Sequence, residues 1–324
     1  MPEADKKLVA RFGRWVAWAV GLGVLLYVAG AVWGGLDEVG GQLTGFSWGI
    51  YVPVLLLTLV NYFGRFLKWH FLLRSLNVEI GFLDNLGIYV AGLAMVISPG
   101  KVGEMLKPWL VSQRTGVSLA TTTPALVAER LTDGIAMLIL AAIGVSTYAA
   151  DSIVYVAVPS VLIVLGLLVL MSRTLSLAIL GVLARLPVLR KGAHRLEEMY
   201  SALRTCLSPM ALLWTIALSL VAWWAECVGY LLVFEGLGEQ VSLGACTFLY
   251  AFATIAGGAM PGGLGVADGA LIGGAVEILG VSEPISVASA LLIRVATLWF
   301  GVVLGAIALL WFDRLLGGVD LEQE

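Results

Sequence analysis

Two Pro-Gly breaks interrupt apolar segments of this sequence, and their surroundings recur in the same order. The breaks lie in residues 98–104 (SPGKVGE) and residues 260–268 (MPGGLGVAD). Each is followed by helix-forming residues, a Gly-Val-Ser triplet and an apolar segment with an arginine. Pro99 and Pro261 are 162 residues apart, and Arg130 and Arg294 are 164 residues apart. Matches in one order, with an insertion of only two residues, predict an internal duplication.

The apolar content of the whole chain indicates where such breaks would lie. Of the 324 residues, 60% are hydrophobic and only 13% are charged. A water-soluble fold cannot bury so much apolar surface, so the composition predicts an integral membrane protein. The net charge of −3 gives no basis for nucleic-acid binding.

Cysteine and histidine are too scattered to predict a metal or redox centre. Cys206, Cys227 and Cys246 match no metal-binding or redox spacing and are interpreted as small apolar residues. His70 and His194 are isolated in the sequence. We therefore predict no metal and no other cofactor.

Long apolar segments predict an all-α integral membrane fold with about six transmembrane helices. A helix needs about 20 apolar residues to cross the hydrocarbon core. The predicted spans are residues 15–33, 48–73, 119–148, 153–171, 210–234 and 285–312. The first span has no small-residue cleavage site, so we expect it to be retained and not removed as a signal peptide.

Two further apolar segments, residues 84–97 and 243–260, are short for a membrane span. Each ends at a Pro-Gly break, and a second helix follows at about residues 101–113 or 267–279. Proline ends a helix because it lacks an N–H and clashes with the preceding turn. We therefore predict two re-entrant helical hairpins that dip into the membrane and return.

Basic residues predict the orientation of the chain. Lys and Arg precede the first span, follow the second and recur in residues 172–208, whereas no loop predicted to be outside carries either. By the positive-inside rule, both termini and this basic linker are cytoplasmic. We expect a multi-pass protein of the plasma membrane (a cell inner membrane). The linker is interpreted as a topology determinant, with contact to lipid headgroups as the alternative.

These elements predict a single polytopic membrane domain, residues 1–324, that contains an inverted repeat. Residues 48–149 and 210–312 each comprise a span, a re-entrant hairpin and a span. The first copy starts outside and the second inside, so the copies have opposite orientation. Inverted repeats with broken helices are a transporter architecture in which the substrate site lies between the repeats.

Ionisable side chains in or near the apolar segments are the first candidates for a binding site. They include Glu129, Arg130, Asp133, Glu226, Asp268 and Arg294. Placing Arg or Asp at mid-bilayer costs roughly 2.5–3.5 kcal/mol on insertion scales, so each needs a structural or functional reason. The structural alternative is an ion pair that stabilises the bundle, such as one between Arg130 and Asp133, which share a helix face.

The functional interpretation places an anionic headgroup between Arg130 and Arg294, one from each repeat. The charged candidate residues are Arg130, Arg294, Glu104, Asp133, Asp268, Lys101, Lys107 and Glu129. The acids would orient the arginines or gate the path, and the two lysines, near the predicted cytoplasmic mouth, would draw anions in. Arg65 and Lys68 are interpreted instead as anchors that snorkel to the membrane interface.

The backbone at the breaks is a second candidate. A Pro-Gly break inside the membrane frees N–H and C=O groups that must face protein or a wet cavity. The returning helices begin near Lys101 and Leu264, so their N-termini point inward and suit a phosphate. Close approach of a ligand is allowed at Gly100, Gly103, Gly262, Gly263 and Gly265, next to Pro261. The alternative is that these glycines only let helices pack.

The ordered motifs resemble the flippase-like transmembrane family, named for the membrane domain of bacterial lysylphosphatidylglycerol synthase/flippase. The resemblance covers about residues 10–314 and rests on residues 99–104 (PGKVGE), 129–133 (ERLTD) and 261–265 (PGGLG) with Asp268. It implies a lipid-translocating membrane domain with motif positions Glu104, Arg130, Asp133, Pro261, Gly262, Gly263, Gly265 and Asp268. The sequence ends at Glu324, so we expect no soluble aminoacyl-transfer domain and no lysine transfer.

These observations predict a lipid flippase or scramblase, not an enzyme, that moves an anionic or phosphate-bearing lipid through a polar site between the repeats. Its partner is a membrane lipid with an anionic headgroup, and a second copy or a synthase is a further candidate partner. One alternative is an ion- or proton-coupled transporter of a small soluble anion, and another is a membrane subunit of a lipid or glycan synthase. A lipid-phosphate enzyme is disfavoured because His70 and His194 lie far from both breaks in the sequence.

Overall fold

The protein is predominantly helical in the part that its structure describes. The computed structural model describes residues 35–98, 103–148 and 193–316, with Gly21, Leu25 and Val32 before them. No strand occurs in these ranges, and the predicted all-α membrane fold is confirmed. Most of the predicted first span and the whole predicted fourth span lie outside the described residues.

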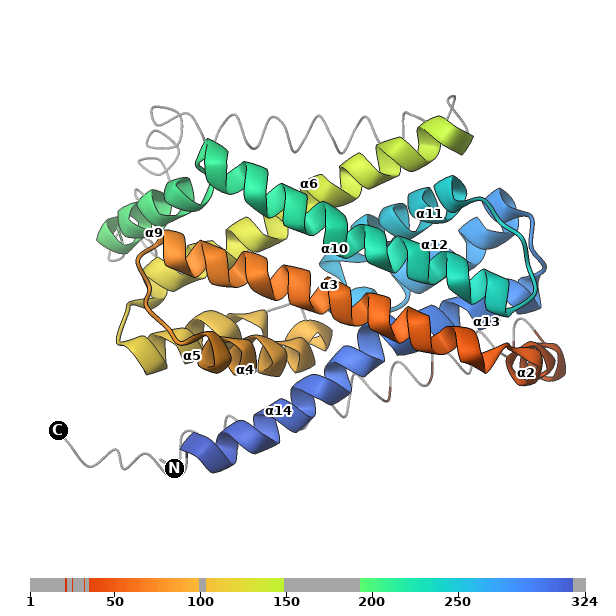
Figure 1. Cartoon of the computed structure of the whole chain (residues 1–324), viewed down its shortest axis with the longest axis horizontal. Coiled ribbons are helices and arrows are strands. Elements are labelled where there is room, and N and C mark those ends of the chain that lie inside the picture. Colours follow the sequence, from red (N-terminus) through yellow and green to blue (C-terminus); the bar gives the residue numbers. More distant parts are fainter. Residues whose placement is uncertain are drawn as a thin grey trace.

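Two long antiparallel helices, α3 (Trp48–Ser75) and α10 (Pro209–Gly236), lie side by side along the molecule (Figure 1). They correspond to the predicted second and fifth spans. Asn61 Nδ2 donates a hydrogen bond to the carbonyl of Ala222 at 3.0 Å, which ties the middle of α3 to the middle of α10. α10 begins at Pro209, a position where the missing N–H breaks no helical hydrogen bond.

The described residues before and after the first Pro-Gly break form a helical hairpin, whereas residues 99–102, which contain the break itself, lie outside the described part. α4 (Phe82–Leu93) continues as the 3₁₀ turn η1 (Ala94–Ile97), and α5 (Leu106–Thr115) returns beside α4. Gly116 ends α5 with a φ of 71°, a left-handed conformation that glycine adopts at low cost. α6 (Leu119–Tyr148) follows with the bounds predicted for the third span.

The second Pro-Gly break lies at the turn of a second hairpin. α11 (Leu243–Ala256) leads into two 3₁₀ turns, η5 (Gly257–Ala259) and η6 (Pro261–Gly263). The chain returns as α12 (Val266–Gly274), which packs against α11 and continues as the π-helical turn η7 (Ala275–Leu279).

The predicted sixth span is a helix with a π-helical turn near its middle. α13 (Glu283–Arg294) and α14 (Phe300–Leu316) are joined by η8 (Val295–Trp299), which follows Arg294 directly. Single π turns are frequent at functional sites because they disturb the regular helical hydrogen bonds. Two shorter helices, α2 (Leu36–Gly45) and α9 (Ala193–Cys206), lie at opposite ends of the bundle (Figure 1).

The two hairpins approach from opposite ends of the bundle, and their turns meet between them (Figure 1). α4 and α5 lie toward the end of α3, whereas α11 and α12 lie toward its beginning. η1 and η6 are in contact, and a Cβ added to Gly262 would lie 3.2 Å from Ile97 Cγ2. Two re-entrant hairpins require such an arrangement, although their dipping into a membrane stays a prediction.

The long helix that follows each hairpin packs against the other hairpin. α6 lies along α11 of the second hairpin, and α14 lies along α4 of the first. Within each half, α5 contacts α6 and α12 contacts α13. Each half of the chain therefore makes the same kinds of helix contact as the other half. Repeats of opposite orientation require this equivalence. The division into repeats 48–149 and 210–312 stays a prediction.

Glycines make these two crossings close. A Cβ added to Gly144 of α6 would lie 2.5 Å from the backbone nitrogen of Phe248. One added to Gly305 of α14 would lie 2.3 Å from the backbone nitrogen of Ala94. Backbone therefore meets backbone at both crossings, as is common where membrane helices pack through small residues.

Several segments have the length and composition of membrane spans. In the described part of the chain these are Trp48–Ser75, Pro209–Gly236, Pro261–Leu279 and Glu283–Leu309. The third of them is the returning limb of the second hairpin with its turn. α6 has 30 residues, but three charged residues interrupt its apolar sequence at Glu129, Arg130 and Asp133.

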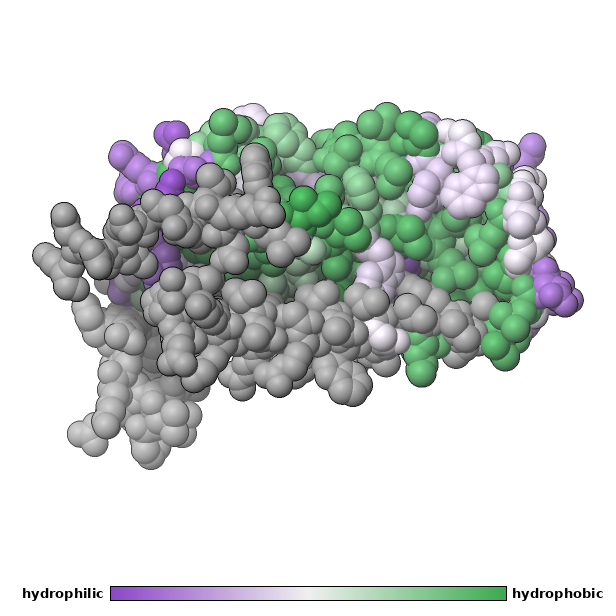
Figure 2. Space-filling model, turned by 90° about the horizontal axis from the view of Figure 1, so that it is seen from below, coloured by the Kyte–Doolittle hydropathy of each residue, from purple (hydrophilic) through white to green (hydrophobic). Residues whose placement is uncertain are grey.

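The outer surface is apolar between two hydrophilic ends. Figure 2 shows hydrophobic residues over the middle of the described part, with hydrophilic residues toward both ends. Along α3, the exposed residues Val52, Leu56, Leu59 and Phe63 recur at helical spacing, so one face of this helix is apolar and outward. A soluble protein rarely exposes such a surface, whereas lipid covers it without cost. The chain is therefore a multi-pass membrane protein.

Gly144→Leu and Gly305→Leu are expected to lower thermal stability, because either side chain forces two helices apart at a backbone contact. Overpacking of this kind costs ~1–3 kcal/mol. Gly269→Ala in α12 is the control, since nothing lies within 4 Å of its added Cβ. Thermal melts of the purified variants in detergent measure the effect. Unchanged melting temperatures for both leucine variants would contradict the close crossings.

Candidate functional site

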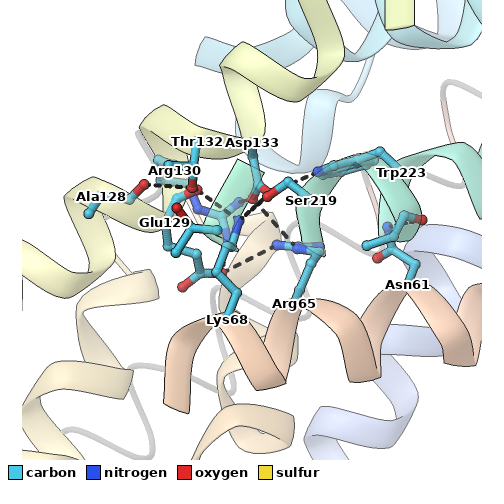
Figure 3. A network of polar contacts seen from close by, with 12 residues as sticks. Asn61, Arg65, Lys68, Ala128, Glu129, Arg130, Thr132, Asp133, Ser219 and Trp223 are labelled. Carbon is cyan, nitrogen blue, oxygen red and sulfur yellow. Dashed lines mark hydrogen bonds and ion pairs between the residues drawn. The ribbon is translucent and has the colours of Figure 1, made fainter. Parts of the chain in front are cut away.

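A network of buried ion pairs lies where α3, α6 and α10 meet, and Asp133 of α6 is at its centre (Figure 3). Asp133 Oδ1 accepts hydrogen bonds from Lys68 Nζ, from Ser219 Oγ at 3.0 Å and from Trp223 Nε1 at 2.9 Å. Arg65 Nε lies 3.6 Å from Oδ2 of the same carboxylate. Side chains of α3 and α10 therefore converge on one carboxylate of α6.

Glu129, one helical turn earlier in α6, is a second centre of the network. Its buried carboxylate accepts hydrogen bonds from Lys107 Nζ at 2.5 Å and Arg130 Nη2 at 2.7 Å. Arg65 Nη2 lies 3.8 Å away. Lys107 is 4% exposed, and its ammonium lies 4.7 Å from the ring centre of Trp69. Its predicted position at a cytoplasmic mouth is therefore corrected: Glu129 and an aromatic ring hold Lys107 inside the bundle.

Arg65 and Lys68 correct a second prediction. They were expected to snorkel to the membrane interface, but they are 7% and 0% exposed and bind the carboxylates of α6. The spacing of polar residues on α3 contains the signal for this burial. Thr58 and Asn61 precede them at helical intervals, so all four lie on one buried stripe. A polar stripe along an apolar helix indicates a polar interior, because lipid cannot satisfy it.

The network holds one more positive than negative charge when all its groups are ionised. Its cations are Arg65, Lys68, Lys107 and Arg130, and its carboxylates are Glu104, Glu129 and Asp133. Burial of each ion costs several kcal/mol, which close partners offset. The ion pair expected between Arg130 and Asp133 is present at 3.9 Å. The surplus positive charge favours a further anion.

A second buried ion pair holds the turn of the second hairpin. Arg294 Nε lies 2.8 Å from Asp268 Oδ1, and Arg294 Nη2 donates a hydrogen bond to the carbonyl of Gly262. Asp268 Oδ2 accepts the N–H of Gly265 at 2.8 Å. The N-terminus of α12, predicted to suit a phosphate, is thus met by a carboxylate of the chain itself. Gly262 and Gly265 have φ of 57° and 82°, which favour glycine.

The two hairpins carry equivalent ion pairs. Arg130 Nε lies 3.3 Å from Glu104 Oε2 in the first half, as Arg294 lies beside Asp268 in the second. The two acids and the two arginines share one offset, since 268 − 104 and 294 − 130 are both 164. Each pair joins the start of a returning limb to the long helix that follows it. In each half, one arginine therefore links the returning limb of the hairpin to the long helix that follows.

A cavity of about 110 Å³ lies between the two hairpins. Arg65, Arg130 and Arg294 line it together with Glu226, and the other lining residues include Tyr62, Trp223, Tyr250, Gly262 and Gly263. The space is large enough for several waters, and so for a group of phosphate size. It is too small for the acyl chains of a lipid. Its charged lining therefore suits a compact anionic group.

Arg130 has donors left for a further acceptor. Its side chain is 30% exposed, against 8% for Arg65 and 12% for Arg294. Among the described residues, its one hydrogen bond runs from Nη2 to Glu129. A guanidinium has five N–H donors in a planar fork that matches carboxylate and phosphate oxygens. Arg130 therefore has the chemistry to bind an anion in the cavity.

Most of the predicted site residues lie at the two hairpins and the helices that hold them. These are Gly103, Glu104, Lys107, Glu129, Arg130, Asp133, Pro261, Gly262, Gly263, Gly265, Asp268 and Arg294. Gly100 and Lys101 lie outside the described residues. Sequence reasoning missed Arg65 and Lys68 as residues of the site, and it did not single out Trp223. No pattern in the sequence reveals that the indole of Trp223 donates to Asp133.

The fold and the site define a polytopic α-helical membrane protein with a charged cavity between two hairpins. Residues 14–305 match the family described as lysylphosphatidylglycerol synthase TM region, and the chain belongs to this family. The resemblance inferred from the motifs is thereby confirmed. The chain is also 26% identical over 309 residues to a UPF0104 membrane protein of Methanothermobacter thermautotrophicus, a match that covers 88% of this chain and 90% of the relative. No solved structure matches the chain.

Asp133→Asn is expected to destabilise the protein by ~3–5 kcal/mol, because it leaves Lys68 and Arg65 buried with one carboxylate fewer. Asp84→Asn is the control, since its partner Arg114 lies 3.5 Å away and the Asp84 side chain is 51% exposed. Loss of an exposed pair costs ~0–1 kcal/mol. Unfolding of the purified variants in detergent compares them. Equal stability of the two variants would show that the network is not a stabilising core.

Proposed function

We propose that this protein moves an anionic or phosphate-bearing lipid across the membrane, with the headgroup passing through the cavity between the hairpins. Membership in a family named for the membrane region of a lipid synthase supports a lipid-related role. The proposed process makes and breaks no covalent bond, so the protein is a transporter and not an enzyme. The lipid is its principal partner, and a second copy or a separate synthase is a further candidate.

The observation that carries this proposal is the meeting of Arg130 and Arg294 in one cavity. The two arginines come from different halves of the chain, and each is the partner of an acid on its own hairpin. Arginine binds phosphate through parallel N–H···O bonds, which are stronger than bonds between neutral groups. A phosphate between these arginines would contact both hairpins at once.

The ion pairs of the hairpins supply a way to admit the headgroup. A phosphate that binds Arg130 competes with Glu104, and one that binds Arg294 competes with Asp268. When one of these ion pairs breaks, its hairpin can move while the ion pair of the other hairpin remains intact. The cavity then opens toward one end at a time. Rocking of inverted repeats around a central site works in this manner in other transporters. The acyl chains remain in the bilayer because the cavity cannot hold them.

The charges at the two ends support the proposed orientation. Arg74, Arg114 and Arg204 lie at the end where α3 stops and α10 begins. At the other end, α2 and the described loops between helices contain acids such as Asp37 and Glu239 and no Lys or Arg. The positive-inside rule places the basic end in the cytoplasm. We propose this orientation for a protein of the plasma membrane, with both termini in the cytoplasm.

A transporter of a small soluble anion is the second candidate, and the small volume of the cavity favours it. The same arginines would bind a free phosphate ester as readily as a lipid headgroup. The two functions differ in whether acyl chains accompany the anion. An assay that follows a lipid and a soluble anion in the same vesicles therefore separates them.

Vesicles that contain the purified protein are expected to move fluorescent phosphatidylglycerol between leaflets faster than protein-free vesicles. Arg130→Gln and Arg294→Gln should each slow this movement at least about tenfold, because a lost charge-assisted hydrogen bond costs ~1.5–3 kcal/mol. Arg130→Lys keeps the charge but loses the planar fork, so an intermediate rate is expected. Chemical quenching of the outer leaflet measures the rates.

Arg114→Gln is the matched control, because Arg114 is 47% exposed at the end of the bundle and is expected to leave the rate unchanged. Size-exclusion chromatography checks that each variant is folded. Wild-type rates in both cavity variants would leave the two arginines as structural residues only. Uptake of radioactive phosphate without lipid movement would favour the soluble-anion transporter.

A further inference from the structure

Glu226 of α10 is a buried carboxylate that lines the cavity and belongs to none of the ion pairs described above. It is 3% exposed and lines the cavity with the three arginines. Its Oε2 accepts a hydrogen bond from the Tyr250 hydroxyl at 2.6 Å. Within the described ranges, no Lys or Arg nitrogen lies within 4.0 Å of it.

Every other buried carboxylate of the described residues has a cation at ion-pair distance. These carboxylates are Glu104, Glu129, Asp133 and Asp268. Burying an unpaired charge is costly, and a group in this situation changes its protonation more readily than a paired one. Glu226 is therefore the carboxylate of this site that can gain and lose a proton without breaking an ion pair.

The position of Glu226 also breaks the symmetry between the halves. α3 and α10 both have 28 residues, and Glu226 is 161 residues after Arg65, as Pro209 is after Trp48. The first half thus places a permanent cation where the second half places an acid. Asn61 and Ala222, which bond to each other at 3.0 Å, have the same offset of 161, so this correspondence is seen in the packing as well.

The groups that face Glu226 come from four neighbouring helices. They are Arg65 and Tyr62 from α3, Asp133 from α6, Tyr250 from α11 and Arg294 from α13, with Arg130 of α6 on the same cavity. The Tyr62 hydroxyl donates to the carbonyl of Thr297 at 2.7 Å, so it is already used. The cavity lining therefore has three arginines and one carboxylate that is not paired with any of them.

We propose that Glu226 is a proton-binding site coupled to the anion, so that the cavity takes up one proton with each anionic headgroup. In the empty cavity, the ionised carboxylate balances part of the charge of the arginines. When a phosphate binds as well, two negative charges face one surplus positive charge in a space of low dielectric. Proton transfer from water to a Glu226 oxygen removes one of them. This inference rests on the proposed function of the cavity.

The coupling has a consequence for energetics. A phosphodiester headgroup carries one negative charge, and the proton carries one positive charge, so the loaded cavity gains no net charge. Movement of a neutral load is insensitive to membrane voltage but responds to a difference in pH. Because binding is reciprocal, a bound proton strengthens anion binding as much as the anion strengthens proton binding.

Calorimetry on the purified protein in detergent tests the proposal with two probes. Dioctanoyl phosphatidylglycerol tests a lipid headgroup, and dimethyl phosphate tests the same phosphodiester without acyl chains. Titration in buffers of different ionisation enthalpy gives the number of protons taken up. We expect about one proton per bound anion, and an affinity that falls about tenfold per pH unit where Glu226 is ionised in the empty protein.

Glu226→Gln imitates the protonated residue and keeps an acceptor for Tyr250. It is expected to take up no proton on binding and to lose the tenfold dependence on pH. Glu235→Gln, an exposed acid nine residues later on α10, is the control and should retain both. In vesicles, an imposed pH gradient should drive net accumulation of the lipid by the control but not by Glu226→Gln.

The outcomes separate this inference from the proposed function. Anion binding without proton uptake overturns the coupling alone, as does proton uptake that persists in Glu226→Gln. Absence of binding by both probes overturns the anion site and the coupling together. Binding of dimethyl phosphate but not of the lipid, with one proton taken up, supports the coupling and assigns it to a soluble anion.

Discussion

The structure depends on the pairing of charge inside an apolar bundle. Glu129 and Asp133 lie one turn apart on α6; Arg65 of α3 lies within ion-pair distance of both carboxylates, and Lys68 of α3 pairs with Asp133. Neither the carboxylates of α6 nor the cations of α3 can be exposed to lipid without a large cost in free energy. The charges therefore constrain how α3 and α6 are rotated toward each other. The indole of Trp223 adds α10 to the same group. The long helices therefore enclose a polar interior, and the hairpins close it.

This interior combines a symmetrical frame with an asymmetrical set of charges. The contacts between long helices and hairpins recur when the halves are exchanged, and so do the ion pairs of Arg130 and Arg294. The extra cations Lys68 and Lys107 belong to the first half alone. The second half contributes Glu226 to the shared cavity. A symmetrical frame suits alternate opening toward two ends, whereas asymmetrical charge gives the two ends different chemistry.

Sequence reasoning predicted the elements well, because span length, Pro-Gly breaks and basic residues act locally. The bounds of α6 agree with the prediction at both ends, and the second hairpin turns at the predicted break of Pro261 and Gly262. It also identified Arg130 and Arg294, whose equivalence follows from a constant offset. It was wrong about Arg65 and Lys68. Because both lie near the predicted end of a span, they were expected at the membrane interface. The side of α3 on which they lie decides their burial.

The sequence by itself determined that the chain is a helical membrane protein, where its helices break and which charges require a reason to be buried. These properties follow from composition and spacing along one segment at a time. Only the tertiary structure decided which cation meets which carboxylate, that arginines from both halves reach one cavity, and that Glu226 has no cation partner there among the described residues. Such partnerships depend on how each helix is rotated against its neighbours, and helices far apart in the sequence set that rotation together.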